Sequence, residues 1–288
     1  ADFTYGEITT MQQAMAAFDR KDFDNAEQLL TTALEDFKRR GRPPPAVAQV
    51  LGMRGQVRTD KKDFVNAIRD YDECLAIMEV DGRRPDGTAA YVEFPDTHVN
   101  RGLAREGLSD WAGAVDDYSA AIALWGGDSA LAEGIDGVNP YVLTFRGNAL
   151  AAQGLYEQAL GDYQIAESIF SRVERNSDMI AQSRANRALA LYELGREEES
   201  EKIMRSIVKR VPGFTDMHVA LAMIAYHKGD LATAETEWDI ACNRISSGCS
   251  KYRDIDWVRR IRRWPPSLVA IMEQYTVQMG SSMSVSAP

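Results

Sequence analysis

The sequence of 288 residues predicts an all-α fold, a right-handed α-solenoid of about six helix-turn-helix repeats with a C-terminal helical cap. The first observation behind this prediction is one pattern that returns six times along the chain. In most copies an aromatic or apolar residue is followed, at intervals of three, four and three, by a small, a large and a second small residue. These intervals place all four side chains on one face of a helix. The most regular copies are Trp111/Ala114/Tyr118/Ala121 and Tyr156/Ala159/Tyr163/Ala166.

Glycine and proline mark the ends of the predicted helices. Gly154, Gly195 and Gly229 precede the second helix of a repeat, where a tight helical hairpin needs the left-handed backbone that glycine tolerates. Pro95 and Pro140 stand where a first helical turn begins and a missing N–H has no cost. The repeats are therefore expected near 7–40, 48–80, 95–125, 140–171, 181–212 and 215–245.

The chain beyond the repeats has a different pattern. The solenoid is predicted as one domain over 1–245, because each repeat packs only on its neighbours. A basic, Trp-containing segment and a capping helix are expected over 246–279, where Leu268, Ile271, Met272 and Tyr275 recur at helical spacing. Residues 280–288 are too small and polar to pack, so they are expected to form a flexible tail.

The repeated pattern resembles the tetratricopeptide repeat, a helix-turn-helix unit of 34 residues, over residues 7–245. The small residue that this family has in its first helix is present as Gly55, Gly102, Gly147, Ala188 and Ala222. Glu197 and Ser200 depart from the aromatic residue and Ala that the family has in its second helix. Four junctions are longer than the family unit, so a row of loops is expected at 39–45, 81–87, 126–137 and 172–178, as one docking surface.

The resemblance implies a concave groove lined by the first helices. Its outward positions include Gln49, Gln56, Asn100, Leu103, Asn148, Asn186 and Leu189. Amide side chains both donate to and accept from an extended peptide backbone, so these residues are candidates for partner binding. The other interpretation is that an amide bonds a neighbouring helix of the solenoid. Family members that grip a C-terminal carboxylate use basic residues where this chain has Thr144, Asp216 and Ala220, which argues against that ligand.

A basic segment near the C-terminus is the second candidate for partner binding. Between Lys251 and Trp264 there are six basic and two acidic residues, a local charge of +4 on a chain of net charge −10. Arg and Trp are enriched at the centres of protein interfaces. The candidate docking residues are Trp257, Arg259, Arg260, Arg262, Arg263 and Trp264. The alternative is that the segment pairs with acidic faces of its own solenoid while the two Trp side chains pack inside.

The same segment resembles the C-terminal end of tetratricopeptide proteins of the plant and algal thylakoid lumen. The resemblance is carried by residues 252–257 and by Arg262 to Pro266. It implies a mature protein of the chloroplast thylakoid lumen, whose partners are photosystem subunits or the light-harvesting complex at the lumenal surface. A chain that opens on Ala1 instead of Met fits removal of a presequence, and it fits a trimmed chain equally well.

The cysteines bear on the compartment. Cys74 takes a small-residue position in a repeat and is expected to be a buried thiol. Cys242 and Cys249 flank a stretch that ends in Gly248, where a helix that doubles back can bring the second sulfur near the last turn. A disulfide between them is sterically feasible, and an oxidising lumen favours it far more than a reducing cytosol does, so the sequence leaves their redox state open. Two Cys without a neighbouring His do not form a metal site.

Composition and motifs exclude several classes of function. The net charge of −10 opposes binding to nucleic acid and to anionic lipid, and no stretch approaches the length that spans a membrane. The three His, at 98, 218 and 227, fall in different predicted helices, and no catalytic or cofactor motif is present.

The sequence predicts a noncatalytic scaffold without cofactor or metal, peripheral to a membrane at most, bound to a photosystem as a subunit or an assembly or stability factor. The alternative is a soluble adaptor that binds exposed peptides in the groove and has no photosynthetic role.

Overall fold

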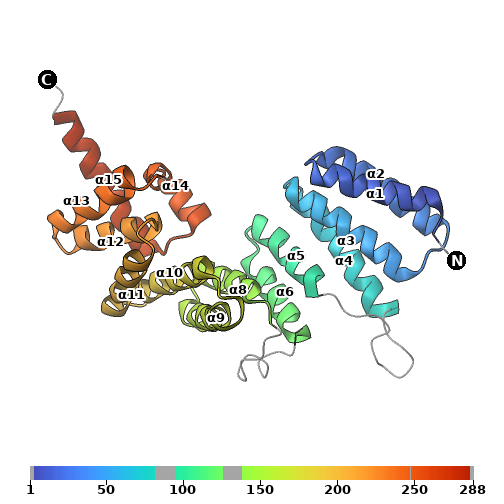
Figure 1. The fold of residues 1–288 in the computed structure, drawn as a ribbon, viewed down its shortest axis with the longest axis horizontal. Coiled ribbons are helices and arrows are strands. Elements are labelled where there is room, and N and C mark those ends of the chain that lie inside the picture. The colour runs from blue at the N-terminus through green and yellow to red at the C-terminus, as the bar shows by residue number, and fades with distance from the viewer. Residues whose placement is uncertain (1–2, 82–94, 126–137, 247, 286–288) are drawn as a thin grey trace. The chain divides into compact units, whose positions relative to one another are not determined.

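The computed structural model of the chain describes residues 3–81, 95–125, 138–246 and 248–285 (Figure 1). The described residues form α-helices with short π-helical and 3-10 turns, and consecutive helices pair as antiparallel hairpins. The predicted all-α fold of paired helices is confirmed. The chain divides into two compact units, Ala1–Val142 (unit 1) and Leu143–Pro288 (unit 2). The loop expected at 81–87, apart from Asp81, and the one expected at 126–137 lie outside the described residues.

Unit 1 contains three hairpins. They are α1 (Tyr5–Asp19) with α2 (Phe23–Arg39), α3 (Pro44–Asp60) with α4 (Phe64–Asp81), and α5 (Pro95–Gly107) with α6 (Trp111–Leu124). Consecutive hairpins also pack on each other, through α2 on α3 and α4 on α5.

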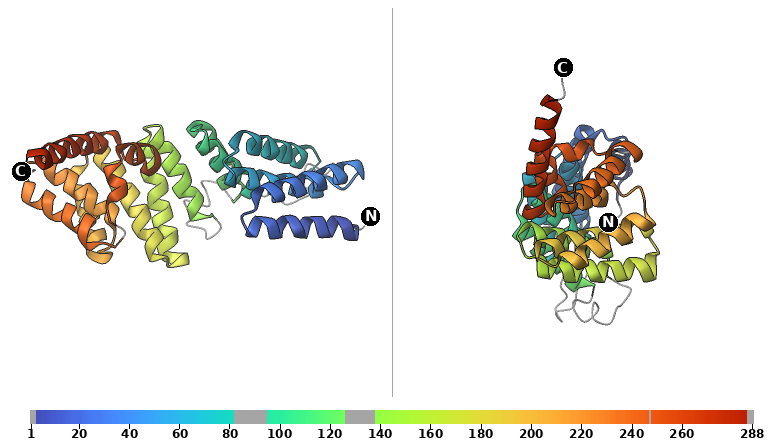
Figure 2. Two further views of the ribbon diagram at one scale, coloured as in Figure 1. Left: turned by 90° about the horizontal axis from the view of Figure 1, so that it is seen from above. Right: turned by 90° about the vertical axis from the view of Figure 1, so that its left-hand side faces the viewer.

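Unit 2 continues the series. Helix α8 (Pro140–Ala152) begins at the boundary between the units and is followed by α9 (Tyr156–Ile169) with a π-helical turn, Phe170–Glu174. The next hairpins are α10 (Ser177–Glu193) with α11 (Glu197–Arg210), and α12 (Thr215–His227) with α13 (Leu231–Asp239), which ends in a second π-helical turn, Ile240–Arg244. Figure 2 shows these paired helices from two further directions.

The C-terminal cap folds back on unit 2. After a 3-10 turn (Ser250–Arg253), the chain forms the short α14 (Ile255–Trp257), a π-helical turn (Val258–Arg262) and α15 (Pro266–Val285). Helix α15 packs on α12 and α10 through the buried face that its apolar spacing predicts, with Leu268, Ile271, Met272 and Tyr275. It continues to Val285, within the stretch for which a flexible tail is expected.

The turn inside each hairpin depends on one residue with left-handed backbone. Gly154, Gly195 and Gly229 have φ of 78°, 75° and 79°, as their place in the sequence predicts. In unit 1 the equivalent turns use Lys21, Lys62 and Ser109, with φ of 60°, 67° and 61°. The hairpin geometry is therefore kept in unit 1 without the glycine, at a conformational cost that the packed helices offset.

Three successive hairpins share the same contact between their two helices, an Arg-Gly pair on the first helix against an Asp-Tyr pair on the second. Arg54-Gly55, Arg101-Gly102 and Arg146-Gly147 on the first helices face Asp70-Tyr71, Asp117-Tyr118 and Asp162-Tyr163, sixteen residues later, on the second helices. Each Arg forms an ion pair with its Asp at 2.6–2.7 Å, and each Asp is buried. Each Gly leaves room for the Tyr ring, because a Cβ atom there would lie 2.6 Å from a ring carbon. The repeated small residue thus accommodates an aromatic ring.

Candidate protein-binding groove

The outward face of each first helix is defined by three positions: six residues before, two residues before and one residue after the small residue of that helix. We call them the groove positions. In unit 1 they are Gln49, Met53 and Gln56 on α3, and Asp96, Asn100 and Leu103 on α5. On α8, which spans the boundary between the units, they are Tyr141, Phe145 and Asn148. In the rest of unit 2 they are Gln182, Asn186 and Leu189 on α10, and Asp216, Ala220 and Met223 on α12. The residues predicted to line the groove all fall in this set.

Unit 1 has a hollow of about 1000 Å³ at its groove positions. Of the predicted residues, Gln49, Gln56 and Asn100 line it, whereas Leu103 is half-buried and does not. The wall is completed mainly by apolar side chains of α3, α4 and the N-terminal segment, with Met53, Leu75, Met78 and Phe3 among them. The walls of this hollow therefore combine amide groups with flexible apolar surface.

The described wall of this hollow carries charge of one sign. Glu79 and Asp96 line it, and none of the lining residues that the structure describes is Lys or Arg. His98 also lines it, and its Nδ1 lies 3.5 Å from an oxygen of the buried Asp117. The hollow therefore favours a ligand that carries positive charge.

The N-terminal segment contributes Phe3 to the wall of the hollow. The Phe3 ring lies 5.4 Å from that of Phe37, and the Arg42 guanidinium lies over Phe3 at 5.2 Å. Arg42 Nε also donates to Glu7 at 2.7 Å, and this contact lowers the Glu7 pKa to about 2. Cys74 lies in the wall as the expected buried thiol, and burial raises its pKa.

The groove positions of unit 2 are engaged within the chain. Tyr163 Oη donates to Asn148 Oδ1 at 2.9 Å, and Asn186 Nδ2 donates to the same oxygen at 3.1 Å. Gln182 Nε2 donates to Asn186 Oδ1 at 3.1 Å, and the Leu189 side chain is buried. Asn148 and Asn186 thus bond neighbouring helices of the solenoid, as the alternative interpretation of the groove supposes.

The C-terminal segment covers this part of the groove. Arg262 Nε donates to both carboxylate oxygens of Asp216 at 3.0 Å, and its terminal nitrogen bonds Asp216 and also Asn186, the latter at 3.2 Å. Trp264 Nε1 and Tyr252 Oη donate to Asp216 Oδ1 at 3.0 and 2.8 Å. Asp216 is only 7% exposed. Burial alone would lower the Arg262 pKa, but the charge and hydrogen bonding of Asp216, together with Tyr252 and Tyr163, raise it overall. A guanidinium of the chain itself thus occupies the groove between α10 and α12.

The other predicted docking residues have different surroundings. Trp257 packs edge-on against Tyr252 and is half-buried. Arg263 turns the backbone with φ of 56°. Arg259 pairs with Glu273, and Arg260 with Asp256 at 3.1 Å, at the surface. Together with Ile261, which is 66% exposed, Arg259 and Arg260 form the part of this segment that faces outward.

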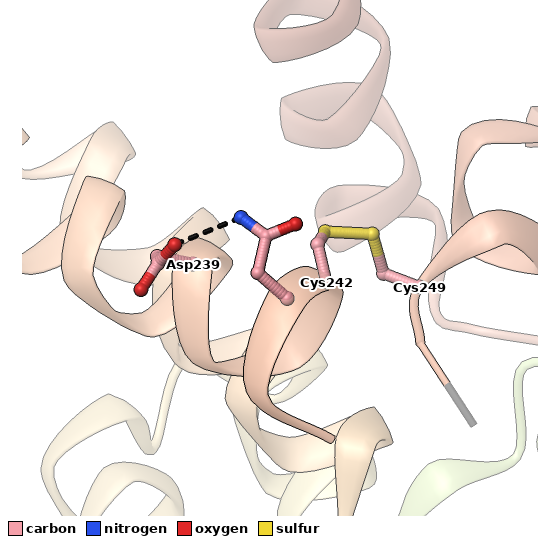
Figure 3. The surroundings of a disulfide bond; sticks show 4 residues. Asp239, Cys242 and Cys249 are labelled. Carbon is pink, nitrogen blue, oxygen red and sulfur yellow. Dashed lines mark hydrogen bonds between the residues drawn. A yellow bond between two sulfur atoms is a disulfide. The ribbon is translucent and has the colours of Figure 1, made fainter. Parts of the chain in front are cut away.

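A disulfide joins Cys242 and Cys249, whose Cα atoms are 4.5 Å apart (Figure 3). Gly248, with φ of 61°, lets the chain double back between them. The residue after Cys242, Asn243, donates from its Nδ2 to Asp239 Oδ1 at 2.8 Å. The disulfide therefore attaches the start of the C-terminal segment to the last repeat.

Two further features bear on function. Within the described parts of the chain, no group of His, Cys, Asp and Glu side chains is arranged to hold a metal ion. Among the helices that the structure describes, none combines the length and apolar character that crossing a membrane requires.

Comparisons with known proteins agree with the repeat architecture. A family model described as "Tetratricopeptide repeat" matches residues 11–77 and 151–213. A tetratricopeptide repeat protein of known structure from Parabacteroides merdae is 15% identical and matches 96% of this chain and 94% of its own, with a TM-score of 0.66. The apo form of RapI is 10% identical over 97% and 99% of the two chains, with a TM-score of 0.61. No curated protein sequence matches the chain. At these identities, the solved structures show the fold alone.

Proposed function

We propose that this chain, a tetratricopeptide repeat protein, is a noncatalytic scaffold that binds an extended segment of another protein in the groove of unit 1. The observation that carries the proposal is the hollow of about 1000 Å³ at the groove positions of α3 and α5. Its amides suit the backbone of an extended peptide, and its Met and Leu side chains adapt to apolar residues. In unit 2 the corresponding positions are already bonded to the chain itself.

A binding experiment with a matched control tests this function. Dodecapeptides that bind the full chain are selected from a random phage-displayed library, and their affinity is measured by fluorescence polarisation. We expect the double variant Gln49→Ala/Asn100→Ala to weaken the selected peptides by about tenfold or more, because each lost amide leaves a peptide group without a partner. The control is Asn25→Ala/Gln28→Ala, which removes two exposed amides from α2. Equal affinity for both double variants would show that the peptides bind elsewhere.

A second candidate function is docking on a photosystem in the thylakoid lumen, as a peripheral subunit or an assembly or stability factor. The Cys242–Cys249 disulfide supports it, because structural disulfides persist in oxidising compartments and are rare in the cytosol. The resemblance of the C-terminal segment to lumenal tetratricopeptide proteins supports it too. The docking surface in this case is the outward part of that segment, Arg259, Arg260 and Ile261.

Co-purification tests the second candidate. The tagged chain is expected to recover photosystem polypeptides from solubilised thylakoids, and Arg259→Ala/Arg260→Ala is expected to lose them. These two side chains form only exposed ion pairs, so their removal costs about 1 kcal/mol of stability or less. Recovery of no photosystem polypeptide by the unaltered chain would rule this function out and leave the adaptor.

A further inference from the structure

The last hairpin of unit 1 and the last hairpin of unit 2 share an Asp, a His and a Val at the same positions of their first helices. Helix α5 starts with Asp96-Thr97-His98-Val99 after Pro95, and α12 starts with Asp216-Met217-His218-Val219 after Thr215. In both helices the Asp is the second residue and stands six positions before the small residue of the first helix. In both, the His Nδ1 faces an acid nineteen residues later, Asp117 at 3.5 Å and Glu237 at 2.6 Å. The two Asp residues therefore hold equivalent places in their repeats.

In unit 2 the structure contains the group that binds this Asp. The Asp216 carboxylate receives the Arg262 guanidinium through its Nε and a terminal nitrogen, a two-pronged contact that a single ammonium group does not reproduce. Aromatic side chains of the same segment, Trp264 and Tyr252, donate to the same carboxylate. The chain therefore shows which ligand this groove position accepts: an arginine with aromatic neighbours.

In unit 1 the equivalent carboxylate, that of Asp96, is exposed and lines the hollow. None of the side chains that the structure describes forms an ion pair or hydrogen bond with it. Gln49 on α3 corresponds to Gln182 on α10, so an amide is retained beside the carboxylate. The position of Asn186 is taken by Met53, which makes the rest of the wall more apolar.

We infer that the groove of unit 1 binds an arginine of its partner, whose guanidinium pairs with Asp96 while apolar or aromatic neighbours of that arginine pack on Met53, Leu75 and Met78. The inference rests on the proposed function of this groove and adds the chemistry of its ligand. Glu79 lies in the same wall, and the described part of that wall contains no Lys or Arg, so its charge suits such a ligand.

Selected peptides and two neutral replacements test the inference. Dodecapeptides selected on the full chain are expected to share one arginine. Its replacement by citrulline, which keeps the shape and removes the charge, is expected to weaken binding at least tenfold. Asp96→Asn is expected to weaken the arginine peptide by the same factor and to have no added effect on the citrulline peptide, because the two changes remove one contact. Asp116→Asn, an exposed Asp on α6, is the control and is expected to leave binding unchanged. Circular dichroism on both variants confirms that the fold is kept.

The failure of the inference is distinguishable from the failure of the proposed function. Selected peptides that depend on Gln49 and Asn100 but carry no shared arginine, or bind Asp96→Asn as well as the unaltered chain, would overturn the inference and leave the groove as a peptide site. Binding that is insensitive to Gln49 and Asn100, or no binding peptide at all, would overturn both. A loss in Asp116→Asn equal to that in Asp96→Asn would also contradict the inference, because it would indicate general electrostatics instead of one contact.

Discussion

Asp216→Ala is expected to lower the free energy of unfolding of unit 2 by about 3–5 kcal/mol, the range measured when one partner of a buried ion pair is removed. The substitution leaves the largely buried Arg262 without its counter-charge, and it leaves Trp264 Nε1 and Tyr252 Oη without their acceptor. The effect is larger than that of an exposed ion pair because all of these donors lose an acceptor in a place that water reaches poorly.

Urea denaturation followed by tryptophan fluorescence measures this loss. A control in the same segment is Asp256→Ala, which removes an exposed partner of Arg260 and is expected to cost about 0.5 kcal/mol or less. Limited digestion with trypsin gives an independent readout. Release of the segment would make the peptide bonds that follow its arginines, between 259 and 263, accessible to the protease. Similar stability of the two variants would contradict the role assigned to Asp216.

The fold was predictable because its determinants are local. The repeats expected to begin near 95 and 140 begin at Pro95 and Pro140, where proline fits a first helical turn. Gly154, Gly195 and Gly229 have the left-handed backbone that their position requires. The division into two compact units was not predicted, because the repeats before and after residue 142 carry the same pattern of small and large residues.

The packing of the C-terminal segment could not be predicted from its sequence. Composition marks it as basic and rich in Trp, and this is compatible both with docking to a partner and with packing on its own solenoid. The structure assigns the inward side to Arg262 and Trp264, which reach Asp216 across 46 and 48 positions of sequence. No periodicity relates residues that far apart in two different elements. Docking by Arg259 and Arg260 stays a prediction.

The role of Asp216 could not be predicted from the repeat pattern either, although the sequence contains one indication that this position is special. At the position of Asp216, tetratricopeptide repeat proteins that bind a carboxylate have a basic residue. That comparison shows only that an acid has replaced a base. Aligning the chain with itself shows that Asp96 and Asp216 open equivalent helices, each followed by His two positions later. The ligand of either Asp is not encoded in that alignment, and only the contact with Arg262 identifies it.

Gly147→Ala is expected to lower the free energy of unfolding of unit 2 by about 1–3 kcal/mol, the usual cost of adding a methyl group to a packed core. The new Cβ would lie 2.6 Å from Tyr163 Cε1. The Tyr163 ring cannot move away freely, because it is buried and its hydroxyl donates to Asn148. The clash outweighs the gain in helix propensity, which is about 0.5–1 kcal/mol for Gly to Ala.

Gly161→Ala in the same hairpin separates these two effects. Gly161 lies inside α9, and a Cβ there would meet no atom within 4 Å. This variant therefore keeps the propensity gain alone and is expected to be more stable than the unaltered chain by about 0.5–1 kcal/mol. Opposite signs in urea denaturation would establish that Gly147 is needed for ring packing. Stabilisation by both substitutions would show that α8 and α9 can separate, and that the motif shared by Gly55, Gly102 and Gly147 does not set their distance.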